Sequence, residues 1–159
     1  MILNIGCGEE FYGDVRVDFV KTGSTTIVAD LNNKFPFKSN QFDEIYCRSV
    51  LEHIKNLGQF IEESMRVLKK DGKFYFRTDN ASYIGFIMQN HQSYIANEKW
   101  SRDDKHYYLF KPEHMINLFG ENAKINFACP SKKLFFLPKK YKCMHLEITG
   151  RNYKGGKTR

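Results

Sequence analysis

The segment Ile2-Leu-Asn-Ile-Gly-Cys-Gly8 decides how the rest of the sequence is interpreted. A short apolar run ends at two closely spaced glycines, which is typical of a strand followed by a tight turn. In an open parallel sheet, ligands bind beyond the carboxyl ends of the strands. Glycines at that edge let a ligand approach the backbone, because they carry no Cβ atom. On its own, the pattern is equally typical of a simple tight turn.

Strand patterns and helix patterns alternate after this segment. A capping box, in which two side chains satisfy the free N–H groups of a helix start, is predicted at Ser49-Val-Leu-Glu52. The alternation favours an α/β fold with a Rossmann-like, doubly wound and mostly parallel sheet. Strands are predicted at 15–18, 26–29, 43–47, 73–77, 124–128 and 143–149, and helices at about 57–70, at 112–120 and, less distinctly, at 81–97.

Two acidic residues stand at the ends of the second and third predicted strands. Asp18 can accept hydrogen bonds from both hydroxyls of a ribose, and Asp30 can accept one from an exocyclic amine. The apolar neighbour Leu31 can cover the face of an adenine. Each acid alone is more often a turn or capping residue. Together with the glycine turn, on successive strand ends, they predict a site for a nucleoside.

These residues resemble the class I S-adenosylmethionine-dependent methyltransferases, above all the small ones with a Val-Leu-Glu-His segment after the fourth strand. The resemblance covers about residues 2–80 and implies a seven-stranded sheet with an antiparallel last strand and S-adenosyl-L-methionine as cofactor. It rests on Leu3-Asn-Ile-Gly-Cys-Gly8, Asp18, Asp30-Leu31, Phe35-Pro-Phe37, Phe42-Asp-Glu-Ile-Tyr46, Ser49-Val-Leu-Glu-His-Ile54 and Arg66-Val-Leu-Lys-Lys-Asp-Gly72.

The resemblance also implies which residues form the site. Arg48 and Ser49 would face the methyl group or the acceptor. The methionine part of the cofactor would lie near the first strand and its turn, the ribose near the end of the second strand, and the adenine after the third. In that order the implied residues are Asn4, Gly6, Cys7 and Gly8, then Asp18 and Phe19, then Asp30, Leu31 and Asn32.

Three residues are candidates for a general base, which a hydroxyl acceptor would need. His53 follows a helix start near the fourth strand, Asp79 ends the fifth, and His106 lies in a segment rich in aromatic and charged residues. Each has an ordinary alternative role, on a helix surface, in a turn or in a surface loop. We expect the segment around Tyr107 to act as a lid over the substrate.

The sequence departs from the family pattern at its start. Asn4 replaces the acid that usually precedes the first glycine, which would weaken cofactor binding. Only six residues, Glu9 to Asp14, are left for a crossover that normally needs a dozen or more, so no full first helix fits. Either a bare loop crosses over, or the second strand is misplaced. We therefore expect a fold truncated at its N-terminus and an open site, completed by the loop around Tyr107 or by a second copy in a homo-oligomer.

The charge is unevenly distributed. The chain of 159 residues has a net charge of +7, and residues 122–159 carry ten basic residues and one acid, Glu147. A basic segment of this kind can bind RNA or another polyanion. It is also typical of a solvated chain end. We expect a methyltransferase domain over residues 1–149 and a basic flexible tail over 150–159.

Several other classes are disfavoured. The four cysteines, at 7, 47, 129 and 143, form no Cys-x-x-Cys pair, so neither a metal site nor a disulfide framework is expected. No apolar run reaches the length of a membrane span and no secretory signal is evident, which favours a cytoplasmic protein without membrane contact. A nicotinamide dehydrogenase is disfavoured because Phe11 stands where Gly-x-Gly-x-x-Gly has its third glycine.

Three functions remain open from the sequence. The first is a methyltransferase acting on a small molecule, a glycan or another metabolite. The second is an RNA-directed methyltransferase that holds its substrate through the basic C-terminal region. The third is a non-catalytic module that binds S-adenosylmethionine, which the short glycine turn and Asn4 suggest.

Overall fold

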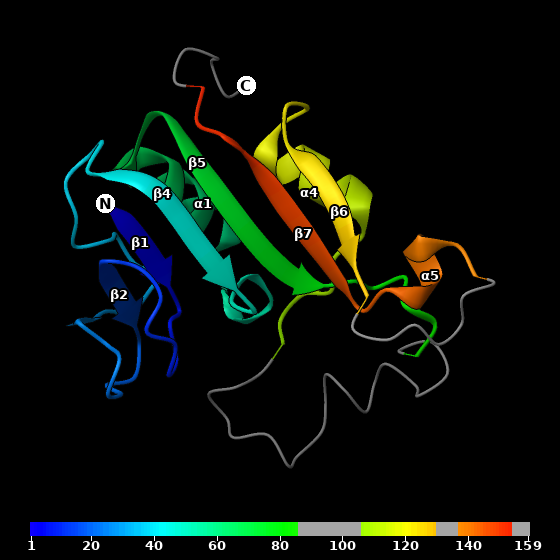
Figure 1. The fold of residues 1–159 in the computed structure, drawn as a ribbon, viewed down its shortest axis with the longest axis horizontal. Helices are drawn as coiled ribbons and strands as arrows, with labels where there is room; N and C mark the ends of the chain where they lie inside the picture. The colour runs from blue at the N-terminus through cyan, green and yellow to red at the C-terminus, as the bar shows by residue number, and fades with distance from the viewer. Residues whose placement is uncertain (86–105, 130–136, 154–159) are drawn as a thin grey trace.

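The computed structural model describes residues 1–85, 106–129 and 137–153. Within them a single mixed sheet has the strand order β3-β2-β1-β4-β5-β7-β6 (Figure 1). The first five strands are parallel, and β7 is antiparallel to both of its neighbours, as expected. The strands are β1 (Ile2–Ile5), β2 (Val15–Asp18), β3 (Ile27–Val28), β4 (Phe42–Arg48), β5 (Leu68–Asp79), β6 (Lys124–Ala128) and β7 (His145–Arg151).

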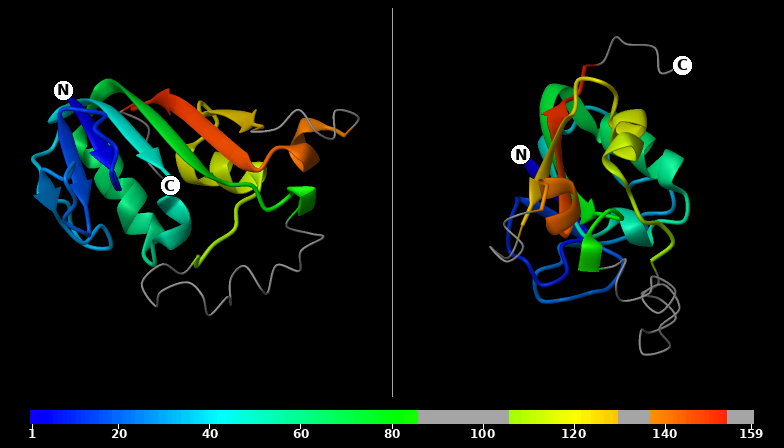
Figure 2. Two further views of the ribbon diagram at one scale, coloured as in Figure 1. Left: turned by 60° about the horizontal axis from the view of Figure 1, so that its bottom comes forward. Right: turned by 90° about the vertical axis from the view of Figure 1, so that its right-hand side faces the viewer.

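One face of the sheet carries the hydrophobic core. Helices α1 (Leu57–Val67) and α4 (Pro112–Phe119) both lie against this face (Figure 2). Alternate strand residues point to opposite faces, so Ile5, Ile45 and Phe76 meet the helices and are fully buried. Each such side chain contributes about 1.5–3 kcal/mol on leaving water. Two short helical segments complete the described elements, η1 (Leu51–His53) and α5 (Lys139–Lys142).

The connection between β1 and β2 is a bare loop over residues 6–14. The predicted second strand is confirmed, and it pairs directly with β1 in the register Leu3↔Val15. Asp14 fixes the far end of the loop, since its carboxylate accepts from the Ile2 amide and its own amide donates to the Ile2 carbonyl. The sheet edge above β1 and β2 therefore forms without a crossover helix.

Two expectations for the middle of the chain are wrong. Ser49 and Glu52 form no capping box, because Ser49 has a φ of 52° and η1 starts after Val50 without a side-chain cap. The helix expected over 57–70 ends at Val67, and the chain enters β5 at the next residue. Pairing of Leu68 with β4 overrides the helical tendency of the lysines that follow.

The sheet also extends beyond the domain boundary expected at 149. Gly150 and Arg151 belong to β7, and Asn152 is buried. The side-chain amide of Asn152 donates to the carbonyl oxygens of Met65 and Leu68, which joins the segment after β7 to the junction of α1 and β5. The expected helix at 81–97 lies mostly outside the described residues, as do residues 154–159.

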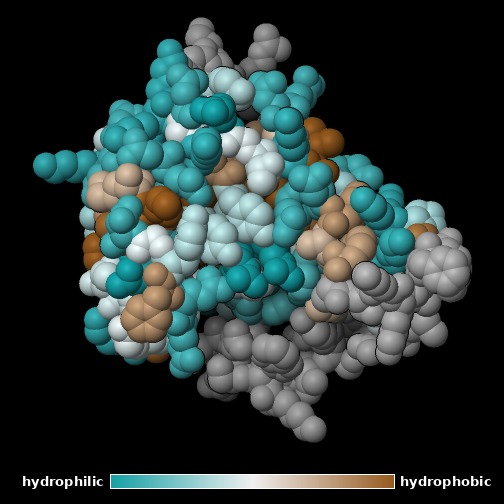
Figure 3. All heavy atoms as spheres, in the orientation of Figure 1, coloured by the Kyte–Doolittle hydropathy of each residue, from teal (hydrophilic) through white to brown (hydrophobic). Residues whose placement is uncertain are grey.

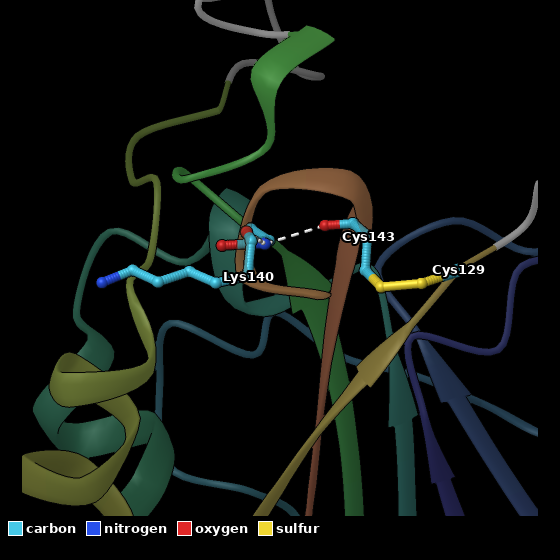
Figure 4. The surroundings of a disulfide bond; sticks show 4 residues. Cys129, Lys140 and Cys143 are labelled. Atoms are coloured by element: carbon cyan, nitrogen blue, oxygen red, sulfur yellow. Dashed lines mark hydrogen bonds between the residues drawn. A yellow bond between two sulfur atoms is a disulfide. The ribbon is translucent and has the colours of Figure 1, made fainter. Parts of the chain in front are cut away.

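Cys129 and Cys143 form a disulfide at the end of β6 and just before β7 (Figure 4). The sequence-based expectation that the chain lacks a disulfide is therefore wrong. Antiparallel pairing of Ala128 with His145 brings the two cysteines together, with their Cα atoms 4.2 Å apart. The spacing of the cysteines along the chain carries no sign of this pairing. Cys7 and Cys47 are free and buried.

Replacing Asn152 by alanine should destabilise the domain. Asn152→Ala leaves buried carbonyl groups without a donor, and a lost buried hydrogen bond costs about 1–3 kcal/mol. Urea unfolding followed by circular dichroism measures the change. The adjacent and exposed Tyr153 is the control, and Tyr153→Ala should change the stability little. Equal stability of both variants would show that Asn152 does not fasten the segment after β7.

Candidate active site

A pocket of about 610 Å³ lies at the carboxyl ends of β1 to β4. Eight of the residues implied by the resemblance line it, including both acids and both glycines. The lining residues are Gly6, Gly8, Asp18, Phe19, Val20, Asp30, Leu31, Asn32, Ser49, Val50, His53, Ile54, Lys55 and Tyr107. The acids of two neighbouring strands and the glycine turn thus share one hollow.

The two glycines of the turn have different roles. Both have positive φ values, 67° for Gly6 and 51° for Gly8. A Cβ atom on Gly6 would lie 2.2 Å from the Cγ2 atom of Val50, so the packing leaves no room for a side chain at this position. A Cβ atom on Gly8 would have no heavy atom within 4 Å. Gly8 therefore leaves its backbone accessible from the pocket.

Asp18 fastens this turn to the end of β2. One carboxylate oxygen accepts from the Gly8 amide at 2.8 Å, and the other accepts from the Val20 amide at 3.0 Å. A carboxylate offers about four lone-pair sites, so acceptor capacity remains. Asp18 can hold the turn and still receive the hydroxyls of a ribose.

Asp30 organises the next segment of the pocket wall. Its carboxylate accepts from the Asn32 amide at 2.9 Å and from the side-chain amide of Asn33 at 2.9 Å. The side-chain oxygen (Oδ1) of Asn32 in turn accepts from the Lys55 amide at 2.8 Å. Lys55 places its ammonium 5.5 Å from the ring centre of Tyr107. The end of β3 is thus joined to the segment that precedes α1.

Three implied cofactor or substrate residues lie outside the lining of the pocket. Asn4 is buried on the opposite face of β1 and donates to the Tyr12 carbonyl, and Arg48, on the same face of β4, pairs with Glu10 at 2.6 Å. The strand pleat turns both side chains away from the helices. The Cys7 sulfur lies 3.8 Å from the hydroxyl groups of Ser24 and Thr25. The assignment of these three residues to the site stays a prediction.

The structure brings the candidate bases together behind one wall of the pocket. His53 lines the pocket, and the ring of His106 meets it edge-on with 4.5 Å between the ring centres. Asp79 lies between two imidazoles, with oxygen atoms 3.6 Å from Nδ1 of His106 and 3.1 Å from Nδ1 of His145. Of the three candidates only His53 is in the lining of the pocket. The catalytic roles of His53, Asp79 and His106 stay predictions.

Glu52 belongs to the same group, although the sequence analysis gave it only a capping role. Its side chain is buried and accepts a hydrogen bond of 2.8 Å from the Thr78 hydroxyl, while its carbonyl accepts from the Tyr107 amide at 2.7 Å. Burial, followed by the charge of Asp79, raises the pKa of Glu52 to about 7. The sequence signal that could have indicated this buried acid is the position of Glu52 among apolar residues in Val-Leu-Glu-His-Ile.

Comparison with known proteins agrees with this geometry. A model of the methyltransferase domain family matches residues 8–76. An uncharacterized protein of Methanocaldococcus jannaschii is 34% identical over 83 residues, which is 52% of this chain and 40% of that protein. The chain therefore spans well under half the length of this curated relative.

Solved methyltransferases share the fold over nearly the whole chain. An S-adenosylmethionine-dependent methyltransferase of Thermotoga maritima superposes with a TM-score of 0.70 at 13% identity, covering 95% of this chain and 81% of that one. One from Archaeoglobus fulgidus gives 0.68 at 13% identity, covering 94% and 85%. A Haloferax volcanii methyltransferase solved in complex with the Trm112 activator gives 0.63 at 14% identity, covering 95% and 81%.

The chain has the fold of the class I S-adenosylmethionine-dependent methyltransferases, and a methyltransferase domain model matches part of it, residues 8–76. S-adenosylmethionine is the cofactor of this class. No helix within residues 1–85, 106–129 and 137–153 is long and apolar enough to span a membrane. The same residues contain no cluster of three or more side chains suited to a metal ion.

The two glycines should respond differently to substitution. Gly6→Ala should cost about 2–4 kcal/mol, because left-handed strain adds to the collision with Val50. Gly8→Ala should cost about 1 kcal/mol, because only the strain applies there. Chemical unfolding of both variants measures the difference, and equal losses would contradict the packing role of Gly6.

Glu52 should make the domain less stable as the pH rises. The pKa of Glu52 is higher in the folded protein than in the unfolded chain, so folding favours the protonated carboxyl group. This contribution to the stability is complete below the pKa of the unfolded chain and is lost as the pH rises through about 7. The change from about pH 5 to about pH 8 is on the order of 3 kcal/mol. Melting curves at both pH values should show a smaller change for Glu52→Gln. The exposed Glu62→Gln is the control, and unchanged pH dependence in Glu52→Gln would contradict the assignment.

Proposed function

We propose that the domain transfers the methyl group of S-adenosylmethionine to a polar acceptor bound beside His53. The observation that carries this proposal is the pocket at the carboxyl ends of β1 to β4, lined by Gly8, Asp18, Asp30 and Leu31. The activity is a proposal because the chain spans only 40% of its curated relative and the solved structures share the fold at low identity.

The residues present fit this cofactor. The turn at Gly8 offers backbone without a Cβ atom for the methionine part, and Asp18 retains acceptor capacity for the ribose hydroxyls. Asp30 and Leu31, as acceptor and apolar cover, suit an adenine. S-adenosylmethionine supplies an electrophilic methyl group on a sulfonium, and the role of the protein is mainly to hold the acceptor in line with it.

His53 is the residue placed to take a proton from the acceptor. It lines the pocket and has His106 against its ring, with Asp79 next to His106. An oxygen or nitrogen nucleophile that loses a proton on methylation suits such a site.

Two classes of acceptor remain proposals. The first is a small molecule, a glycan or another metabolite, which would reach the pocket beside Tyr107. The second is RNA held by the basic C-terminal region, of which the structure describes 122–129 and 137–153. Methylation of RNA should fall steeply with salt, whereas methylation of a small acceptor should not. A cytoplasmic location and a homo-oligomer that completes the site also remain proposals.

Calorimetry with S-adenosylmethionine and with S-adenosylhomocysteine tests the cofactor site. Asp18→Asn should weaken binding of both at least tenfold, about 1.4 kcal/mol, because an amide replaces one acceptor oxygen. Asp43→Asn is the matched control, since Asp43 pairs with the N-terminus and Lys69 outside the lining of the pocket. Binding unaffected by Asp18→Asn would contradict the assigned site.

Turnover separates an enzyme from a non-catalytic binding module. Transfer of a labelled methyl group to candidate acceptors should be lost in His53→Ala, while cofactor binding persists in that variant. Cofactor binding in the wild-type protein without transfer to any acceptor would favour the binding module instead.

A further inference from the structure

The sheet has a second face, and it carries a hollow that methyl transfer does not use. Within the described residues no helix covers this face, which looks toward the viewer in Figure 1 and has mostly hydrophilic side chains in Figure 3. A hollow of about 420 Å³ lies on it. The lining residues are Glu44, Lys73, Phe74, Tyr75, Asn122, Lys124, Thr149, Gly150, Arg151 and Tyr153.

Three cations meet at this hollow from three neighbouring strands. Lys73 on β5 stands directly opposite Arg151 on β7, and Lys124 on β6 stands opposite Thr149, two residues away from Arg151. Like charges directly opposite each other destabilise an antiparallel pair. Within the described parts of the chain none of the three forms an ion pair, and Glu44 is the single acid of the lining. The hollow is therefore suited to an anion.

Aromatic rings lead up to the same hollow. The rings of Tyr46 and Tyr75 stack at 11° with 5.1 Å between their centres, and Tyr12 meets the other side of Tyr46. Tyr75 ends this row and lines the hollow, so a planar base bound there can extend the stack. Tyr153, which is 55% exposed, lies at the same hollow.

We propose that this hollow binds a single-stranded nucleic acid, with phosphates on Lys73, Lys124 and Arg151 and a base stacked on Tyr75. Cations that follow a backbone, combined with aromatic rings that stack on bases, are the features of such sites. Lys124 and Arg151 also belong to the basic segment 122–159. An isolated phosphate would contact the cations but not the aromatic rings. An acidic peptide would have no planar base to stack on Tyr75.

The hollow is separate from the cofactor pocket. Lys73 pairs with Glu44, four residues before the carboxyl end of β4, which places it about 13 Å along the strands from the edge where the pocket lies. The two hollows share no lining residue. The proposal therefore concerns binding alone and does not depend on methyl transfer. It can succeed or fail in the absence of S-adenosylmethionine.

Fluorescence anisotropy with labelled oligouridine of about eight nucleotides tests the proposal, using the full chain without cofactor. Three phosphate contacts predict a slope of about −2 for log K against log salt, measured from about 50 to about 200 mM. Lys73→Gln and Lys124→Gln should each flatten the slope by about 0.7. Lys38→Gln, an exposed lysine outside the hollow, is the matched control.

A second pair of variants tests stacking. Tyr75→Leu should weaken binding at least fivefold, because stacking on an aromatic ring contributes about 1–3 kcal/mol per base. Tyr75→Phe keeps the ring and removes only the hydroxyl that donates to Glu147, so it should bind like the wild type. Melting curves verify that both variants are folded.

Oligodeoxythymidine and polyphosphate serve as competitors, which distinguish RNA from DNA and from a phosphate chain without bases. Tighter binding of the RNA, or equal binding of both oligonucleotides, supports the proposal, and the first result adds recognition of the ribose 2′-hydroxyl. The proposal is overturned if no oligonucleotide binds at low salt, or if Lys38→Gln weakens binding as much as Lys73→Gln. It is also overturned if polyphosphate competes equally well while Tyr75→Leu has no effect.

Discussion

The hydrogen bond from the Gly8 amide to the Asp18 carboxylate is the constraint on which the candidate site depends. In most parallel sheets a helix occupies the connection between such strands. Here residues 6–14 form a bare loop, so the position of the turn is set by side chains at its two ends. Contact between Gly6 and Val50 adds a second restraint from the segment after β4. The pocket keeps its shape without the usual helix.

Local sequence patterns predicted those helix and strand bounds that are determined by residues close together in the chain. The bounds of α4 follow from Pro112 and Gly120, and the end of β2 at Asp18 follows from the alternation of its residues. Strand β3 ends at Val28, two residues before the Asp30 expected at its end. The Cys129–Cys143 disulfide and the buried Asn152 were missed, because each depends on pairing between strands distant in the sequence. The side on which Arg48 lies could not be predicted, because it is set by which face of the sheet the helices cover.

The sheet separates two kinds of surface. Apolar side chains lie under α1 and α4, while the opposite face carries tyrosines and charged residues that are partly exposed. The cofactor pocket occupies the carboxyl edge, next to the group formed by His53, His106 and Asp79. The cation-lined hollow lies toward the other end of β5. The two proposed ligands would thus occupy different parts of one small sheet.

A titration of ¹⁵N-labelled protein with S-adenosylhomocysteine, followed by NMR, tests the central claim most directly. We expect the amide signals of Gly8, Val20 and Leu31 to move together with one dissociation constant, while those of Lys73 and Lys124 stay in place. Signals that move only around β6 and β7, or none that move at millimolar ligand, would contradict a nucleoside site at the carboxyl edge of the sheet.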